Sequence, residues 1–168
     1  DHVRAEYGRN ADVLEPHWVA LPLSLRNAVS QYQPKWMCWD PAAQDIWIRQ
    51  PPEGAIVDED FFPFFRRGME FEEFTPAFAE WYAQGKLTCC LVGIRTEESL
   101  NRWRTIARTD KSKHDGLPWT TWTGGPTYNA YPIYDWRTED IWTYYGKHRV
   151  PYNRLYDRMH AAGLSIHQ

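Results

Sequence analysis

The sequence predicts an α/β fold in which a parallel sheet carries helices on both faces. Two junctions predict it, because in each an apolar run ends abruptly in a polar segment with acidic residues at the expected helix start. The first junction leads from 87–94 into 97–108, and the second leads from 129–134 into 138–147. Strands that alternate with helices along a chain form parallel sheets that are buried on both sides.

The first half of the chain contains shorter and more aromatic segments. The elements expected there are a helix over 2–9, a buried strand over 18–23, a small strand over 45–49, a helix over 58–67 and a helix over 76–84. Pro63 weakens the prediction of the fourth element, since a proline beyond the first turn breaks a helix. Thr75 is the expected N-cap of the last element, with Pro76 at its first position and Gly85 after its end.

In the second half, the strand over 87–94 leads into a helix over 97–108, for which Thr96 is the expected N-cap. Glu97 and Glu98 lie in its first turn, where the helix dipole favours negative charge. The remaining elements are a long polar loop over 109–127, a strand over 129–134, a helix over 138–147 with Thr138 as its cap, and a last helix over 152–162. A single domain is expected over residues 1–168.

Composition narrows the class of protein. A chain of 168 residues can bury about two thirds of its unfolded surface, and its net charge of -3 gives no basic footprint for generic nucleic-acid binding. No apolar stretch approaches the length of a membrane span, and these 168 residues contain no secretory signal. Three cysteines are an odd number and too few for a disulfide framework. A cytoplasmic protein without membrane contact is therefore expected.

Arg95 is the first candidate for binding a ligand. It lies where the strand over 87–94 ends, and open α/β sheets bind their ligands at the carboxyl ends of strands. A guanidinium group there suits an anion such as phosphate or sulfate. The alternative is a surface arginine that pairs with Glu98 or another acid of the helix.

Both junctions carry motifs that resemble a known family. Residues 93–102 read GIRTEESLNR and residues 131–142 read YPIYDWRTEDIW. This pair resembles the phosphoadenosine phosphosulfate (PAPS) reductase family of adenine nucleotide alpha-hydrolase-like proteins. The chain is most similar to the subgroup of predicted PAPS sulfotransferases, the immunoglobulin-binding-regulator type. Three further segments fit that subgroup: LPLSLRNAVS at 21–30, WMCWDP at 36–41 and VPYNRLY at 150–156.

The resemblance implies a Rossmann-like fold that is incomplete at its N-terminus. The family binds nucleotide with a glycine-rich PP-loop of the form Ser-Gly-Gly-Lys-Asp-Ser, whose N–H groups surround phosphate oxygens. No such loop occurs in these 168 residues, and neither does the Glu-Cys-Gly-type tail that carries the nucleophilic cysteine of the family's reductases. We therefore expect the intact protein to be an enzyme and this chain alone to be inactive, although a genuine absence of the PP-loop stays open.

The resemblance also assigns site residues. Gly93 is expected to let the backbone approach the ligand, and Arg95 and Arg102 are expected to contact its phosphate or sulfate end. Glu98 and Ser99 match the motif and are expected to position the arginines and the helix. In the second motif, Asp135 is the better functional candidate, since a carboxylate there could anchor an arginine of the first motif. Lys111, Lys113 and His114 are expected, from loop position alone, to form a mobile lid. No catalytic residue is assigned.

No metal site built from protein ligands is expected, since the six histidines are scattered and the acidic runs lack ligand spacing. The cofactor expected is therefore only the substrate nucleotide, PAPS or ATP, with Mg²⁺ carried by it if present.

Three functions stay open at this point. The leading one is a PAPS reductase or sulfotransferase-like protein that handles an adenylyl-sulfate or ATP-type nucleotide, with arginines that stabilise charge on the transferred or departing anion. The second is an ATP-dependent enzyme that modifies nucleic acid, as other members of the wider superfamily do. The third is a regulatory module without turnover that acts with a ParB-like protein, a partner implied by the subgroup.

Overall fold

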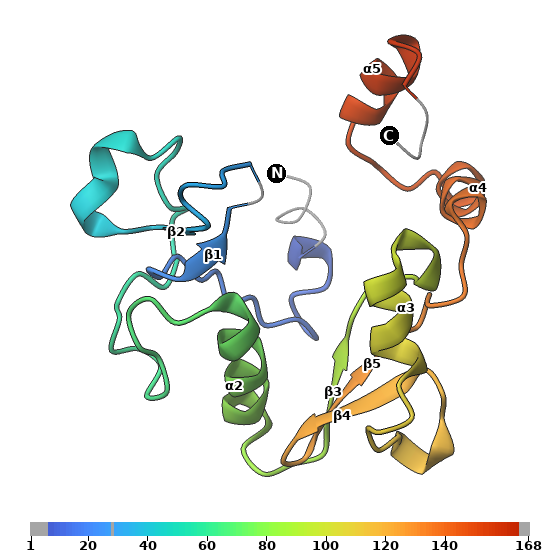
Figure 1. The fold of residues 1–168 in the computed structure, drawn as a ribbon, viewed down its shortest axis with the longest axis horizontal. Coiled ribbons are helices and arrows are strands. Elements are labelled where there is room, and N and C mark those ends of the chain that lie inside the picture. Colours follow the sequence, from blue (N-terminus) through green and yellow to red (C-terminus); the bar gives the residue numbers. More distant parts are fainter. Residues whose placement is uncertain (1–6, 28, 165–168) are drawn as a thin grey trace. The chain divides into compact units, whose positions relative to one another are not determined.

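The computed structural model describes residues 7–27 and 29–164, and the chain divides into two compact units. The first unit spans Asp1–Gly85 and the second spans Lys86–Gln168. Each unit is described by itself, and its elements can be followed by colour in Figure 1. The expected extent of a single domain over 1–168 stays a prediction.

The first unit is built around an aromatic core beside a two-stranded antiparallel sheet. Strand β1 (Ser24–Arg26) pairs with β2 (Lys35–Met37), and the 3-10 helix η1 (Pro41–Ile46) follows them. The helix α2 (Phe71–Ala83) closes the unit (Figure 1). The buried core consists of Leu21, Leu23, Cys38, Phe62, Met69 and Phe74. Because the core side chains come from separate loops and turns and from helix α2, this unit depends on long-range packing.

Helix α2 begins five residues before the proline that was expected to open it. Glu73 accepts a hydrogen bond from the backbone N–H of Glu70 at 3.0 Å, which satisfies one donor at the helix start. Thr75 is therefore inside the helix, where its hydroxyl donates to the carbonyl of Phe71 at 3.0 Å. The early start brings Phe74 into the core, and this packing offsets the local penalty of Pro76 within the helix.

Three other predictions for this unit were wrong. Residues 18–23 form no strand, and only Val19 bridges to Ile56. Residues 45–49 form no strand either, because Asp40 caps the 3-10 helix that Pro41 opens, accepting from the N–H of Ala42 at 3.0 Å. Residues 58–67 are turns instead of a helix, as Pro63 had indicated. Of the helix predicted over 2–9, residues 7–9 are helical and the rest lies outside the described residues.

The second unit contains a three-stranded sheet in the order β3-β5-β4. Strand β3 (Thr88–Leu91) runs parallel to β5 (Thr127–Ala130), with Leu91 opposite Ala130. Strand β4 (Thr120–Gly124) runs antiparallel to β5, and the two form a hairpin (Figure 1). The mixed α/β class and the parallel pair are as predicted. The loop predicted over 109–127 was wrong in part, since it contains β4, which adds an antiparallel strand to the sheet.

The helices of this unit follow the two parallel strands. After β3 come the short η2 (Thr96–Glu98) and α3 (Leu100–Ala107), and after β5 comes α4 (Thr138–His148). The 3-10 helix η3 (His114–Gly116) precedes β4, and α5 (Leu155–Ala161) comes last. The predicted helix over 97–108 is thus interrupted at Ser99, which is the N-cap of α3 in place of Thr96. Arg137, not Thr138, occupies the N-cap position of α4.

Candidate anion-binding site

The two family-like motifs lie side by side because their strands are parallel neighbours. Beyond the paired residues, the N–H of Val92 donates to the carbonyl of Ala130 at 2.8 Å. Further along, both the N–H and the hydroxyl of Thr96 donate to the carbonyl of Tyr134, at 2.9 and 3.0 Å. The chain segments that leave β3 and β5 are therefore joined beyond the carboxyl ends of the two strands, where open α/β folds place ligands.

Arg95 lies between the two segments and is largely buried, with 14% of its side chain exposed. Its Nη1 pairs with Glu97 Oε2 at 3.0 Å and donates to the hydroxyl of Thr138 at 3.3 Å and the carbonyl of Trp136 at 3.4 Å. Its Nε faces Glu98 Oε1 at 3.4 Å. The guanidinium group is therefore held by the acids that the alternative named, although Arg95 is largely buried and is not the surface arginine that this alternative expected.

Glu97 links the two motifs directly, although it was not among the predicted site residues. Its Oε2 accepts from the N–H of Thr138 at 2.7 Å and from the Thr138 hydroxyl at 2.9 Å. These hydrogen bonds, together with the charge of Arg95, lower the pKa of the Glu97 carboxyl. The one signal in the sequence was the repeated Arg-Thr-Glu of residues 95–97 and 137–139.

Arg102 is the more accessible arginine of the first motif, with 48% of its side chain exposed. Its Nε pairs with Glu98 Oε2 at 2.8 Å, four residues earlier on the same side of the helix. Within the part of the chain that the structure describes, its two terminal nitrogens have no partner. Ser99 has a structural role here, since its hydroxyl accepts from the N–H of Arg102 at 3.2 Å and caps α3.

Gly93 is exposed and lies in the loop between β3 and Arg95. A Cβ atom added there meets no other atom within 4 Å, and the residue does not adopt the left-handed conformation that favours glycine. Neither packing nor backbone strain in the described residues therefore requires a glycine. The open space beside this backbone is what a closely approaching ligand needs.

Among the described residues, Asp135 does not anchor an arginine of the first motif. No ion pair joins it to Arg95 or Arg102 among the described residues, because Glu97 and Thr138 already make that connection. Asp135 is exposed and lines a shallow pocket of about 390 Å³ together with Asp140 and other residues of α4.

Two residues of the segment expected to form a lid, Lys113 and His114, are hydrogen-bonded to other residues of the second unit. Lys113 Nζ donates to the carbonyl of Ile106 near the end of α3 at 2.9 Å, and burial lowers the pKa of this amine. The N–H of His114 donates to the hydroxyl of Thr120 at 2.9 Å, and its ring meets the ring of Tyr128 edge-on. These residues support β4 at the far end of α3 from Ser99. This geometry argues against the lid.

Two of the three cysteines, Cys38 and Cys90, lie in surroundings that disfavour a thiolate. Cys38 is buried, and its Sγ lies 3.6 Å from the carbonyl of Leu21. Burial raises the pKa of both Cys38 and Cys90, which keeps these thiols protonated and unreactive. No group of three or more histidine, cysteine or acidic side chains is arranged to hold a metal ion within residues 7–27 and 29–164.

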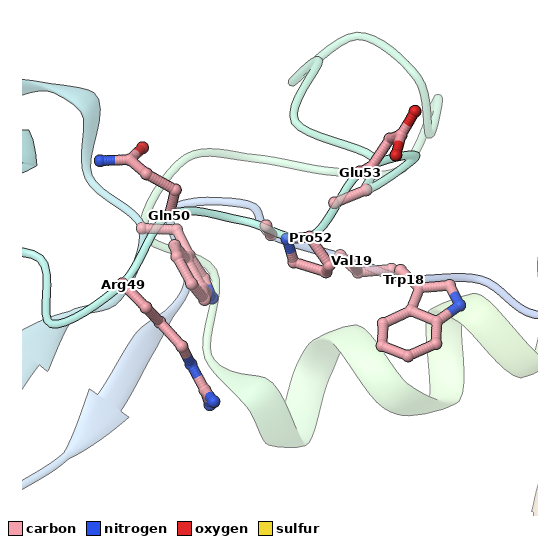
Figure 2. Close-up of a pocket in the computed structure, with 9 residues that line it drawn as sticks. Trp18, Val19, Arg49, Gln50, Pro52 and Glu53 are labelled. Atoms are coloured by element: carbon pink, nitrogen blue, oxygen red, sulfur yellow. The ribbon is translucent and has the colours of Figure 1, made fainter. Parts of the chain in front are cut away.

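A separate pocket of about 560 Å³ lies in the first unit (Figure 2). It is lined in part by Trp18, Val19, Pro52 and the two charged residues Arg49 and Glu53. In Figure 2, the side chains of Arg49 and Glu53 extend in opposite directions. Because one cation and one anion line it, this pocket has no clear preference for an anion.

None of the described helices is both long enough and apolar enough to cross a membrane.

Comparison with known proteins adds two kinds of finding. A family model described as the phosphoadenosine phosphosulfate reductase domain matches residues 65–161. The chain is 48% identical over 158 residues to the uncharacterized protein YbdN of Escherichia coli (strain K12), which covers 92% of this chain and 38% of that protein. It is 35% identical over 82 residues to an adenosine 5'-phosphosulfate reductase of Neisseria meningitidis serogroup B, covering 44% of this chain and 32% of the reductase.

A related reductase of Neisseria meningitidis serogroup A is 31% identical over 106 residues, covering 57% of this chain and 43% of the reductase. The chain thus spans less than half the length of each of these relatives. No solved structure matches it.

Proposed function

The chain belongs to the phosphoadenosine phosphosulfate reductase domain family, and on that premise we propose that the intact protein binds a sulfonucleotide and acts on it as a reductase-like enzyme. The two relatives with named activities are reductases, which favours this proposal over a sulfotransferase. The substrate proposed is an adenylyl sulfate, either adenosine 5'-phosphosulfate or PAPS. Its phosphate or sulfate end is bound where the segments after β3 and β5 meet.

One observation supports this proposal most directly. An accessible guanidinium group lies near the joined segments that follow the parallel strands β3 and β5. Arg102 supplies that group, since only its Nε is engaged by Glu98. An arginine with two terminal nitrogens directed outward can bind an oxyanion with paired hydrogen bonds. We assign the direct contact to Arg102, and the open space at the Gly93 backbone leaves room for a ligand there.

Arg95 has a different proposed role. An anion that reached its guanidinium group would compete with Glu97 and Glu98, which already hold it. We assign Arg95 a structural role, in which it holds the loop after β5 against the loop after β3. Two arginines and two glutamates nearly cancel in charge, so these residues alone form a weak anion site. The glycine-rich loop that the family resemblance implies would supply the additional phosphate contacts.

The proposal assigns binding, and no chemical step, to this chain. Two of its thiols have raised pKa values, and a thiolate is the form that attacks sulfur. In this proposal the group that attacks the sulfonucleotide belongs to another part of the intact protein.

Calorimetric titration of the full-length protein with adenosine 5'-phosphosulfate, PAPS and Mg²⁺-ATP tests this proposal. Arg102→Ala is expected to weaken sulfonucleotide binding about 10- to 100-fold, the usual loss for a charge-assisted hydrogen bond. Arg104→Ala is the matched control, since Arg104 lies two positions along the same exposed helix and points to a different side. Equal affinity in wild type and Arg102→Ala would exclude the assigned contact, and a preference for ATP alone would exclude a sulfonucleotide.

A further inference from the structure

A second pocket of the second unit is not used by the proposed sulfonucleotide site. It has a volume of about 550 Å³, which is within the range of small-ligand pockets. It lies where α4 ends and the following loop turns toward α5. Three aromatic and two cationic side chains line it: Trp142, Tyr145, Tyr152, Arg149 and Arg154.

The aromatic side chains of this pocket hold one another in place. Trp142 contacts Tyr145 and Tyr152 edge-on, with ring centroids 5.9 and 5.3 Å apart. The rings of Tyr145 and Tyr152 are nearly parallel, with an interplanar angle of 13°. The hydroxyl of Tyr152 is fixed by a hydrogen bond to Asp157 at 2.7 Å. An aromatic surface that is already ordered loses little entropy when a flat ring stacks on it.

The same segment is basic, although the chain as a whole is acidic. Residues 141–164 contain four lysines or arginines and a single acid, Asp157, which is engaged by Tyr152. Arg149 and Arg154 are exposed and have no acidic partner within the described part of the chain. The segment is therefore a local cationic region on a chain whose net charge is -3.

A purely structural explanation covers only part of this charge. Lys147 and His148 lie in the last turn of α4, where cations offset the negative end of the helix dipole. Arg149 follows directly and adopts a left-handed conformation as the C-cap. Arg154 lies five residues further on, beyond the reach of that dipole. The helix dipole therefore does not explain why a cation lines the pocket at this position.

Stacking surfaces beside unpaired guanidinium groups are the features that bind single-stranded nucleic acid. Bases stack on aromatic side chains, while arginines contact the phosphates. We propose that this pocket binds a nucleotide unit of a single-stranded nucleic acid. A polymer is favoured over a free mononucleotide because the basic residues extend past the pocket to Lys147 and Arg158. A duplex is not expected, since its bases are already stacked and paired.

The test is fluorescence anisotropy of the full-length protein with labelled 12-nucleotide oligo(dT) and oligo(rU), and with the duplex of the same length as a comparison. Tyr152→Ala is expected to weaken single-strand binding about 5- to 100-fold, in line with the loss of one stacked base. Arg154→Ala is expected to weaken it less and to reduce the slope of log affinity against log salt by about one. Both residues are exposed, so neither change disturbs the core.

Arg66→Ala is the matched control, because Arg66 is an exposed arginine of the first unit with a single long ion pair to Glu73 at 3.8 Å. No binding of either oligonucleotide, or equal affinity in wild type, Tyr152→Ala and Arg154→Ala, would overturn the proposal. Complete competition by AMP at the affinity of the oligonucleotide would overturn the polymer assignment. Sulfonucleotide titration of the same variants is expected to be unchanged, which separates this site from the one at Arg102.

Discussion

Glu97 accepts two hydrogen bonds from Thr138, one from its backbone N–H at 2.7 Å and one from its hydroxyl at 2.9 Å. The two residues are 41 positions apart in the sequence. The same carboxylate also pairs with Arg95, which itself reaches the carbonyl of Trp136. Glu97 therefore helps to fix the starts of η2 and α4 to each other, together with the hydrogen bonds from Thr96 to Tyr134 and from Arg95 to Thr138.

Replacement of Glu97 by glutamine is expected to loosen this connection. An amide oxygen can still accept from Thr138, but the charge that attracts Arg95 is lost and the hydrogen bonds weaken. We expect the melting temperature to fall by a few degrees and sulfonucleotide affinity to fall with it, as measured by differential scanning calorimetry and titration. Glu139→Gln is the matched control, since Glu139 occupies the same place in the second Arg-Thr-Glu sequence and is exposed. An equal effect of both changes would contradict the role of Glu97.

The pKa of Glu97 predicts how this contribution depends on pH. Hydrogen bonds from Thr138 lower the pKa in the folded state below the ordinary value of 4.5. A lowered pKa means that Glu97 takes up its proton at a lower pH in the folded state than in the unfolded state. The stabilisation by its ionised carboxylate is therefore complete above the pKa of the unfolded state. This stabilisation is lost as the pH falls through the pKa of Glu97 in the folded state. The difference in melting temperature between wild type and Glu97→Gln should therefore be constant from pH 7 to about 5.5 and shrink below about 4.5. A difference that grows on acidification would contradict this assignment.

Gly93→Ala separates a ligand role from a folding role. Because an added Cβ meets open space and the backbone is not left-handed, the folded state is expected to be as stable as wild type or slightly more stable. Sulfonucleotide affinity is expected to fall if the ligand approaches this backbone. Gly124→Ala is the contrasting change, since Gly124 has φ +141° at the end of β4, and it should cost about 1–3 kcal/mol. Unchanged affinity in Gly93→Ala would remove Gly93 from the site.

The sequence predicted best where a local signal was strong. Helix α4 was predicted to within one residue at its end, because its acidic first turn and basic last turn mark both ends. Strand β4 was missed, since its threonines show no apolar alternation and its pairing with β5 is not local. Helix α2 was placed too late because core packing of Phe74 outweighs the preference of Pro76 for a first turn.

In the candidate site too, local features could be predicted from the sequence and long-range contacts could not. The position of Arg95 after a strand was predicted from local pattern, but its partners were not. Glu97 and Thr138 meet only because β3 and β5 are adjacent and parallel, which no local pattern encodes. For the same reason Asp135 was chosen as the anchor of an arginine, although the contact is made three residues later by Thr138.

Tyr131 and Thr121 provide a test of the sheet on which the site rests. Their hydroxyl oxygens are 2.8 Å apart, and the side chains are almost fully buried, with 1% and 2% of each residue exposed. Tyr131→Phe leaves the Thr121 hydroxyl buried without this partner, which should lower the free energy of unfolding by about 1–3 kcal/mol. Adding Thr121→Val removes the unpaired hydroxyl, so the double variant should recover part of the loss in urea denaturation. If the double variant instead loses as much free energy of unfolding as the two single variants together, the two hydroxyls make no joint contribution to stability. Tyr131 then stabilises β4 through apolar packing alone.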